Sequence, residues 1–283
     1  MRWTRGGSMK NVDDRRGQRM GMGGGLGLGG GVIGLILALI FGGDILGGGG
    51  GATDGTTATA GGDVAPVSET AEEAERRELS VFVLNDAQEV WGRVLPKYGD
   101  QYRDAKLVLF REATQSACGL GQAGMGPFYC PLDERVYIDL SFFDELQNRF
   151  RASGDFAQAY VIAHEIGHHV QQILGVNNRV RQMQQSRPGE ANELSVRLEL
   201  QADCFAGVWG NSTSQRRILE EGDVEDALNA AGAIGDDRIQ RQTTGSVRPE
   251  SFTHGSSAQR VSWFRRGLES GNPESCDTFA GGR

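Results

Sequence analysis

The sequence predicts an α+β domain that is mostly helical and carries a small sheet. Long stretches after residue 69 show apolar residues at helical spacing, while only residues 106–110 and 135–140 have the composition of short strands. A third observation is that the chain before residue 69 is glycine-rich and has a different composition. We therefore expect an N-terminal region followed by a single globular domain.

Length and charge limit the classes of function. The chain has 283 residues and a formal net charge of -8, which argues against nucleic acid as a partner. Most of the excess among its 43 glycines lies before residue 63, and the remainder is long enough to bury a core of its own.

The N-terminal region divides into three segments. Residues 1–19 are predicted to be a basic cytoplasmic tail, and residues 20–46 a glycine-rich transmembrane anchor, because the chain from Met20 to Gly43 carries no charge. Residues 47–68 read as a flexible linker. The basic side should remain in the cytoplasm, so this topology is single-pass, with the following domain on the outer (periplasmic or extracellular) side of the cytoplasmic membrane. A cleaved signal peptide and a glycine-rich tail that inserts nowhere are the alternatives.

The elements of the domain follow from periodicity, caps and breakers. A helix over residues 69–94 ends before Pro96, and Asp155 is the expected N-cap of a helix that ends near residue 174. The other expected elements are strands at 106–110 and 135–140, helices at 141–151, 190–211, 224–234 and 257–268, and a polar connection at 175–189. Four acidic side chains are expected on solvated faces: Glu225, Asp226, Asp236 and Asp237.

The helix over residues 155–174 contains the motif H-E-x-x-H. His164 and His168 lie one helical turn apart on the same face, so both imidazoles can reach one metal ion, and Glu165 can act as a general base beside them. Two imidazoles and a carboxylate suit a water-activating zinc site. Such a motif arises by chance in about one in a hundred chains of this length, and two packing or capping histidines are the alternative. Gly167 weakens the helix by roughly 1 kcal/mol relative to alanine, which indicates a close neighbour.

A catalytic zinc site needs a third protein ligand. Glu199 and Asp203 lie on one face of the helix over residues 190–211, so Glu199 can bind the metal while Asp203 accepts a hydrogen bond from a ligand imidazole. Glu193 is a less favoured third ligand. His169 points about 100° away from His168 around the helix and is expected to form other hydrogen bonds.

His254 lies on a loop directly before the helix over residues 257–268. A histidine in this position can donate a hydrogen bond to an oxyanion that forms during hydrolysis, which makes it a second candidate catalytic residue beside Glu165. The alternative is a histidine that caps or packs.

The four cysteines fit either two disulfides or four reduced thiols. If the domain lies outside the cytoplasm, disulfides are favoured. Cys118 and Cys130 enclose a glycine-rich loop suited to closure, which leaves Cys204 and Cys276 as the second pair.

Several segments together resemble one family. They are Ser116-Ala117-Cys118-Gly119, Gly126-Pro127-Phe128-Tyr129-Cys130-Pro131, Val136-Tyr137-Ile138-Asp139-Leu140, His164-Glu165-Ile166-Gly167-His168-His169-Val170-Gln171, Glu199-Leu200-Gln201-Ala202-Asp203-Cys204-Phe205-Ala206-Gly207-Val208-Trp209 and Thr253-His254-Gly255-Ser256-Ser257-Ala258-Gln259-Arg260. The chain is similar to the bacterial neutral zinc metallopeptidase family, an anchored, gluzincin-like group. The resemblance implies a zincin-like metallopeptidase domain at residues 69–283, one zinc ion per chain and endopeptidase activity, with Glu199 as ligand and Asp203 behind it. Distant relatives have Thr-His-Pro where this chain has Thr253-His254-Gly255, so the resemblance is looser there.

In zincins an edge strand pairs with the extended substrate, and residues 136–140 are the candidate for it, with an ordinary core strand as the alternative. The expected function is membrane-anchored hydrolysis of peptide bonds, with a peptide or protein as substrate. Two alternatives remain: a zinc hydrolase of cell-wall or other non-protein amides, and a non-catalytic anchored interaction module.

Overall fold

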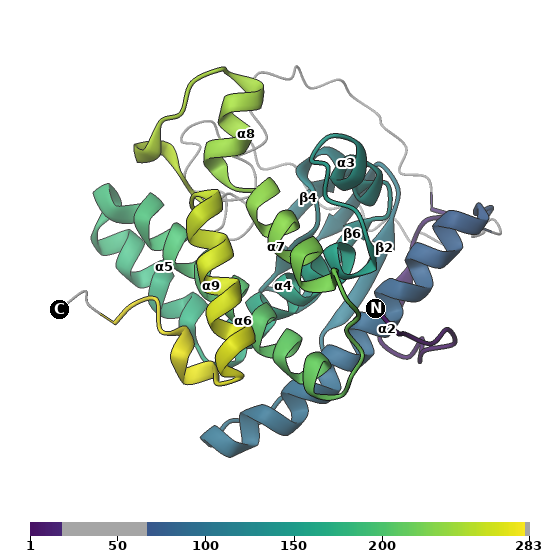
Figure 1. Ribbon diagram of the computed structural model, residues 1–283. Helices are drawn as coiled ribbons and strands as arrows, with labels where there is room; N and C mark the ends of the chain where they lie inside the picture. The colour runs from purple at the N-terminus through teal and green to yellow at the C-terminus, as the bar shows by residue number, and fades with distance from the viewer. Residues whose placement is uncertain (19–66, 281–283) are drawn as a thin grey trace, which may run out of the picture.

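The computed structural model describes residues 1–18 and 67–280, which form the predicted α+β, mostly helical fold (Figure 1). The strands are β1 (Val12–Asp14), β2 (Lys106–Phe110), β3 (Ala113–Ser116), β4 (Gly119–Gln122), β5 (Phe128–Cys130) and β6 (Arg135–Asp139). The helices are α2 (Ala71–Val94), α3 (Phe142–Asn148), α4 (Asp155–Ile173), α5 (Val176–Ser186), α6 (Ala191–Gln215), α7 (Asp223–Ala233), α8 (Asp236–Thr243) and α9 (Ser257–Ser270).

The main sheet has the strand order β1-β2-β6-β5, in which β5 alone runs antiparallel to its neighbour. Alternate residues of β2 and β6 point to opposite faces. Leu107, Leu109 and Ile138 join the large core formed with the helices, whereas Val108 and Tyr137 pack in a smaller cluster with Phe128 and the Cys118–Cys130 pair.

The position of β6 corrects the prediction that residues 136–140 form the edge strand. Strand β6 is hydrogen-bonded to β2 along its whole length and to β5 over residues 135–137, so these three residues have no free edge for a substrate. Within the described chain, β5 is the edge strand on this side of the sheet. The sequence pattern of β6 could not show this, because an interior strand that is buried on both faces also reads as an apolar run.

Helix α4 lies at the centre of the fold, and nearly all of its residues are buried. Its N-cap is Gly154, not the predicted Asp155, which is the first helical residue and accepts a hydrogen bond from Trp3 Nε1 at 2.8 Å. Gly154 has φ of 100°, and a Cβ atom there would lie 2.2 Å from Asp226 Oδ2. Both facts favour glycine at this helix start.

Helices α6 and α9 approach closely. A Cβ atom on Gly207 would lie 2.1 Å from the carbonyl oxygen of Phe264, and one on Gly267 would lie 1.9 Å from that of Cys204. The bond between Cys204 and Cys276 joins α6 to the segment after α9. Both predicted disulfides, Cys118–Cys130 and Cys204–Cys276, are present.

Two helices were not expected from the sequence. Helix α5 occupies the predicted polar connection, and its buried residues are Val176, Asn177 and Val180, too few for a clear apolar stripe. Helix α8 has eight residues and begins at Asp236, which is buried and not on a solvated face as predicted. Helix α3 ends at Asn148, three residues before the predicted end.

Residues 1–18 were predicted to be a separate tail, but in the structure they pack on the domain. Strand β1 pairs with β2 in parallel, and Arg16 donates hydrogen bonds to Asp14 and Glu73 and forms an ion pair with Glu69 at 2.8 Å. Figure 1 shows this segment, in dark purple, beside α2. The predicted anchor at 20–46 and nearly all of the predicted linker at 47–68 lie outside the described residues. Among the residues described, no helix is long and apolar enough to span a bilayer.

Candidate metal centre

The two histidines of the H-E-x-x-H motif and Glu199 come together between α4 and α6. One potential ligand atom from each of His164, His168 and Glu199 lies within 4.8 Å of the others, and all three residues are buried. Glu199 Oε2 is 3.2 Å from His164 Nε2, and Glu199 Oε1 is 3.5 Å from His168 Nε2. The predicted set of three ligands is therefore brought together.

The other ring nitrogen of each histidine has a partner that fixes its tautomer. His164 Nδ1 lies 2.8 Å from Asp203 Oδ1, and because an ionised carboxylate can only accept a hydrogen bond, Nδ1 carries the proton. His168 Nδ1 lies 2.8 Å from Gln171 Oε1, while the amide nitrogen of Gln171 donates to the Leu198 carbonyl at 2.7 Å. Both Nδ1 atoms are therefore donors, and the Nε2 atom of each ring is the one that faces Glu199.

Asp203 belongs to a buried polar cluster behind the centre. Its carboxylate accepts two hydrogen bonds from Arg260 at 2.9 Å each and one from the Tyr160 hydroxyl at 2.5 Å. Burial would raise the pKa of Asp203, but the Arg260 guanidinium and His164 lower it below the ordinary value. Asp203 thus stays ionised, and its charge raises the pKa of His164 to about 9 against the opposing effect of burial.

Glu165 lies beside the three ligands and lines the same cleft. Its side chain is buried, and burial raises the pKa of this carboxyl above its ordinary value. It has no ion pair with the ligands within the described chain, unlike Glu199. A carboxyl with a raised pKa next to a metal centre is suited to take up and return a proton.

His254 also lines the cleft, and Asp236 holds it there. Asp236 Oδ2 accepts hydrogen bonds from the backbone N–H groups of Thr253, His254 and Gly255, at 2.7, 2.6 and 3.1 Å. Asp236 Oδ1 lies 3.3 Å from His254 Nδ1. Burial lowers the pKa of His254, but Glu199 and Asp236 together raise it above the ordinary value.

The remaining candidates lie outside the centre. His169 accepts a hydrogen bond from the Tyr129 hydroxyl at Nδ1 and donates one to the Arg103 carbonyl from Nε2, so both nitrogens are engaged elsewhere. Glu193 is mostly exposed and pairs with Arg197 at 2.7 Å. Neither is a ligand in this arrangement.

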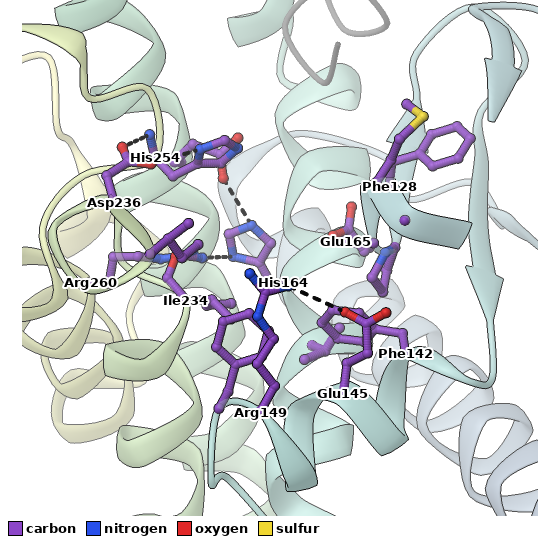
Figure 2. Close-up of a pocket in the computed structure, with 18 of the residues that line it drawn as sticks. Phe128, Phe142, Glu145, Arg149, His164, Glu165, Ile234, Asp236, His254 and Arg260 are labelled. Carbon is purple, nitrogen blue, oxygen red and sulfur yellow. Dashed lines mark hydrogen bonds and ion pairs between the residues drawn. The ribbon is translucent and has the colours of Figure 1, made fainter. Parts of the chain in front are cut away.

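The ligands open into a cleft with a volume of about 420 Å³. Figure 2 shows Asp236, His254 and Arg260 on one side of His164, and Glu165 and Phe128 on the other. Residues 124–129, which include part of the edge strand β5, form one wall.

The donor set fits zinc. Two imidazole nitrogens and one carboxylate, buried and with oriented rings, are the three protein ligands that an open zinc site uses. A family profile described as "Putative neutral zinc metallopeptidase" matches residues 1–279. The chain belongs to this family of neutral zinc metallopeptidases.

Two similar proteins match this chain over nearly its whole length or over about two thirds of it. The protein called "Uncharacterized protein YpfJ" from Escherichia coli (strain K12) is 50% identical over 287 residues, and the match covers 99% of each chain. "Uncharacterized protein Rv2575" from Mycobacterium tuberculosis is 45% identical over 207 residues, which is 69% of this chain and 68% of that protein. No solved structure matches the chain.

Sequence reasoning gave no site role to four residues that support this candidate centre: Tyr160, Gln171, Asp236 and Arg260. Tyr160 and Gln171 lie four residues before His164 and three after His168, so helical spacing could have placed them on or near the ligand face. Gln171 and Arg260 lie within segments that resemble the family, but the resemblance gave them no role. Asp236 comes from another element, and the sequence held no signal for its position.

Proposed function

We propose that this protein is a zinc-dependent peptidase that hydrolyses peptide bonds with Glu165 as general base. The observation that carries the proposal is the buried cluster of His164, His168 and Glu199 beside a cleft that Glu165 lines. A purely structural zinc site has four protein ligands. The described residues bring three together, and a general base lies beside them.

Each residue has a defined task in this proposal. His164 and His168 would hold zinc through Nε2, and Glu199 through its carboxylate, while Asp203 and Gln171 keep the two rings oriented. When bound, zinc polarises a carbonyl group and lowers the pKa of water. Glu165 takes the proton from the attacking water at its carboxylate and later gives it to the leaving amine. His254, fixed by Asp236, donates a hydrogen bond to the oxyanion of the substrate.

An extended peptide can reach the centre along β5. This strand forms the sheet edge next to the cleft, and Phe128 and Tyr129 line it. Backbone pairing with an edge strand is a common way to bind a peptide in extended form. The substrate in this proposal is therefore a peptide or an unfolded protein segment that pairs with β5.

The two disulfides support a location of the domain outside the cytoplasm, on the outer face of the cytoplasmic membrane. Disulfides persist in oxidising compartments and are rare in the cytosol. Attachment to that membrane through residues 20–46 completes the proposal.

The test uses the full chain with zinc content and cleavage of an unfolded protein measured together. Glu165→Gln should keep one zinc ion per chain and lose turnover, whereas Glu199→Ala should lose zinc or bind it much more weakly. Glu193→Ala is the matched control, because it removes an exposed glutamate from the same helix. Cleavage by Glu165→Gln at the wild-type rate would overturn the role of Glu165. Turnover of cell-wall amides without any cleavage of peptides would overturn the peptidase assignment.

A further inference from the structure

The cleft has an apolar part whose role the proposed mechanism leaves open. Its walls include five apolar residues from four regions of the fold, which we name the apolar subsite: Phe142, Phe150, Val161, Ile234 and Ile239. Phe142 and Phe150 come from α3 and the turn after it, Val161 from α4, and Ile234 and Ile239 from the end of α7 and from α8. Side chains from separate elements thus converge on one space next to the metal ligands.

The charges around this space are already engaged. Asp236 is bonded to the His254 loop, and Arg260 is paired with Asp203. At the rim, Glu145 and Arg149 lie 3.9 Å apart and are each about half exposed. Figure 2 shows Phe142, Glu145 and Arg149 grouped on one side of His164. A negatively charged ligand group entering the subsite would lose water and meet no unpaired positive charge among the described residues that line it, which is costly.

The distance from the metal ligands decides which part of a substrate enters. Val161 lies three residues before His164 on α4, which corresponds to about 4.5 Å along the helix axis. An extended peptide advances by about 3.3 Å per residue. The subsite therefore lies within reach of the residue directly next to the bond that is cleaved.

We propose that the apolar subsite binds a large apolar side chain, such as leucine or phenylalanine, that flanks the cleaved peptide bond. This inference rests on the proposed peptidase function and names its substrate class. Burial of such a side chain contributes about 1.5–3 kcal/mol. That free energy corresponds to a preference of roughly 10- to 200-fold in kcat/KM over alanine at the same position.

The experiment compares peptides of equal length that carry alanine, leucine, phenylalanine or aspartate on either side of one cleavable bond. The wild-type protein with zinc should show the preference at one of the two flanking positions and should disfavour aspartate. Val161→Phe fills the subsite and should remove the preference for phenylalanine by at least tenfold while alanine peptides are still cleaved. Ile239→Phe is the second filling variant, because Ile239 is partly exposed and its replacement disturbs the core less.

The matched control is Ile173→Phe. Ile173 lies at the end of α4, is partly buried like Ile239, and is not among the residues that line the cleft. This variant should keep the wild-type preference. Peptides cleaved without any apolar preference, or a preference that survives both filling variants, would overturn the subsite and leave the proposed function intact.

A binding measurement separates failure of the subsite from failure of the peptidase. Glu165→Gln with zinc is titrated with the alanine and phenylalanine peptides, and it should bind the phenylalanine peptide at least tenfold more tightly. The same preference in binding, together with no cleavage by the wild-type protein, would refute the peptidase function and support the subsite as a binding site. Equal binding of both peptides would refute the subsite.

Discussion

Gly167 is the position at which helix packing and metal binding are most directly coupled. A Cβ atom there would lie 2.8 Å from the carbonyl oxygen of Ala202 and 3.1 Å from its Cα atom. Ala202 lies on α6 between Glu199 and Asp203. The predicted close neighbour of Gly167 is thus the backbone of the helix that supplies the third ligand.

Gly167→Ala brings two opposing effects on stability. Alanine in a helix interior is worth about 1 kcal/mol over glycine. Overpacking of a tight helix contact typically costs about 1–3 kcal/mol. We expect the free energy of unfolding of the metal-free protein to fall by about 0–2 kcal/mol.

The effect on metal affinity should be larger than the effect on stability. The new methyl group would be about 0.6 Å short of ordinary contact with the Ala202 oxygen, which begins at 3.4 Å, so α6 must shift by a distance of that order. Zinc-ligand distances tolerate about 0.2 Å. We therefore expect zinc affinity, measured by competition with a chelator, to fall roughly 10- to 100-fold, because Glu199 moves away from His164 and His168.

Alanine substitutions at two other glycines serve as controls for the stability and zinc affinity of Gly167→Ala. Gly92 on α2 is exposed and has no atom within 4 Å of its Cβ position, so Gly92→Ala should raise the free energy of unfolding by about 1 kcal/mol without changing zinc affinity. Gly207 meets a backbone oxygen at 2.1 Å, so Gly207→Ala should destabilise the fold most. The reasoning is refuted if Gly167→Ala behaves like Gly92→Ala in both thermal unfolding and chelator competition.

Three further predictions concern the ligand support, pH and the N-terminal segment. Asp203→Asn should weaken zinc binding by about 10- to 100-fold, because His164 loses its charged partner, and an unchanged dissociation constant would contradict this. Zinc affinity should rise with pH up to about 9, by at most about tenfold per pH unit. The reason is that His164, whose pKa is raised to about 9, must lose a proton to bind the metal. A zinc affinity that does not change between pH 6 and 9 would contradict this. In the metal-free protein the same proton contributes stability that is complete below pH 6.5 and is lost as the pH rises through about 9. Deletion of residues 1–18 should lower Tm by about 5–15 °C, through loss of β1, Trp3 and the buried Arg16, whereas Arg2→Ala, which removes an exposed ion pair, should leave Tm nearly unchanged.

Local signals in the sequence predicted the centre of the site. The spacing of His164, Glu165 and His168, and that of Glu199 and Asp203, depends on helical periodicity alone, and the structure places these residues as predicted. The position of His254 on a loop directly before a helix made it a candidate, and it lines the cleft, although its predicted role in catalysis stays a prediction. Most helix boundaries were within a few residues because caps and breakers are local features.

The failures have a common physical cause, which is that tertiary contacts decide them. Asp236 looked like a solvated helix residue, but the loop at residues 253–255 folds over its carboxylate. The sequence of β6 is compatible with an edge strand and with an interior strand of a sheet, because the sequence of one strand does not specify its pairing partners. Strand β1 has only three residues, Val12–Asp14, two of which are acidic, so its sequence does not predict a strand. It is a strand because it pairs with β2.

The contact between Arg16 and Glu69 has a consequence for how this chain relates to a membrane. The ion pair joins the two described parts of the chain at 2.8 Å, so Arg16 and Glu69 lie side by side on the domain. A path that starts and finishes on one side of a bilayer crosses it an even number of times, whatever course it takes. A single crossing by residues 20–46 would place β1 and β2 in different compartments and would leave the sheet without its first strand. The completed sheet therefore requires residues 1–18 and the metal centre to lie in the same compartment.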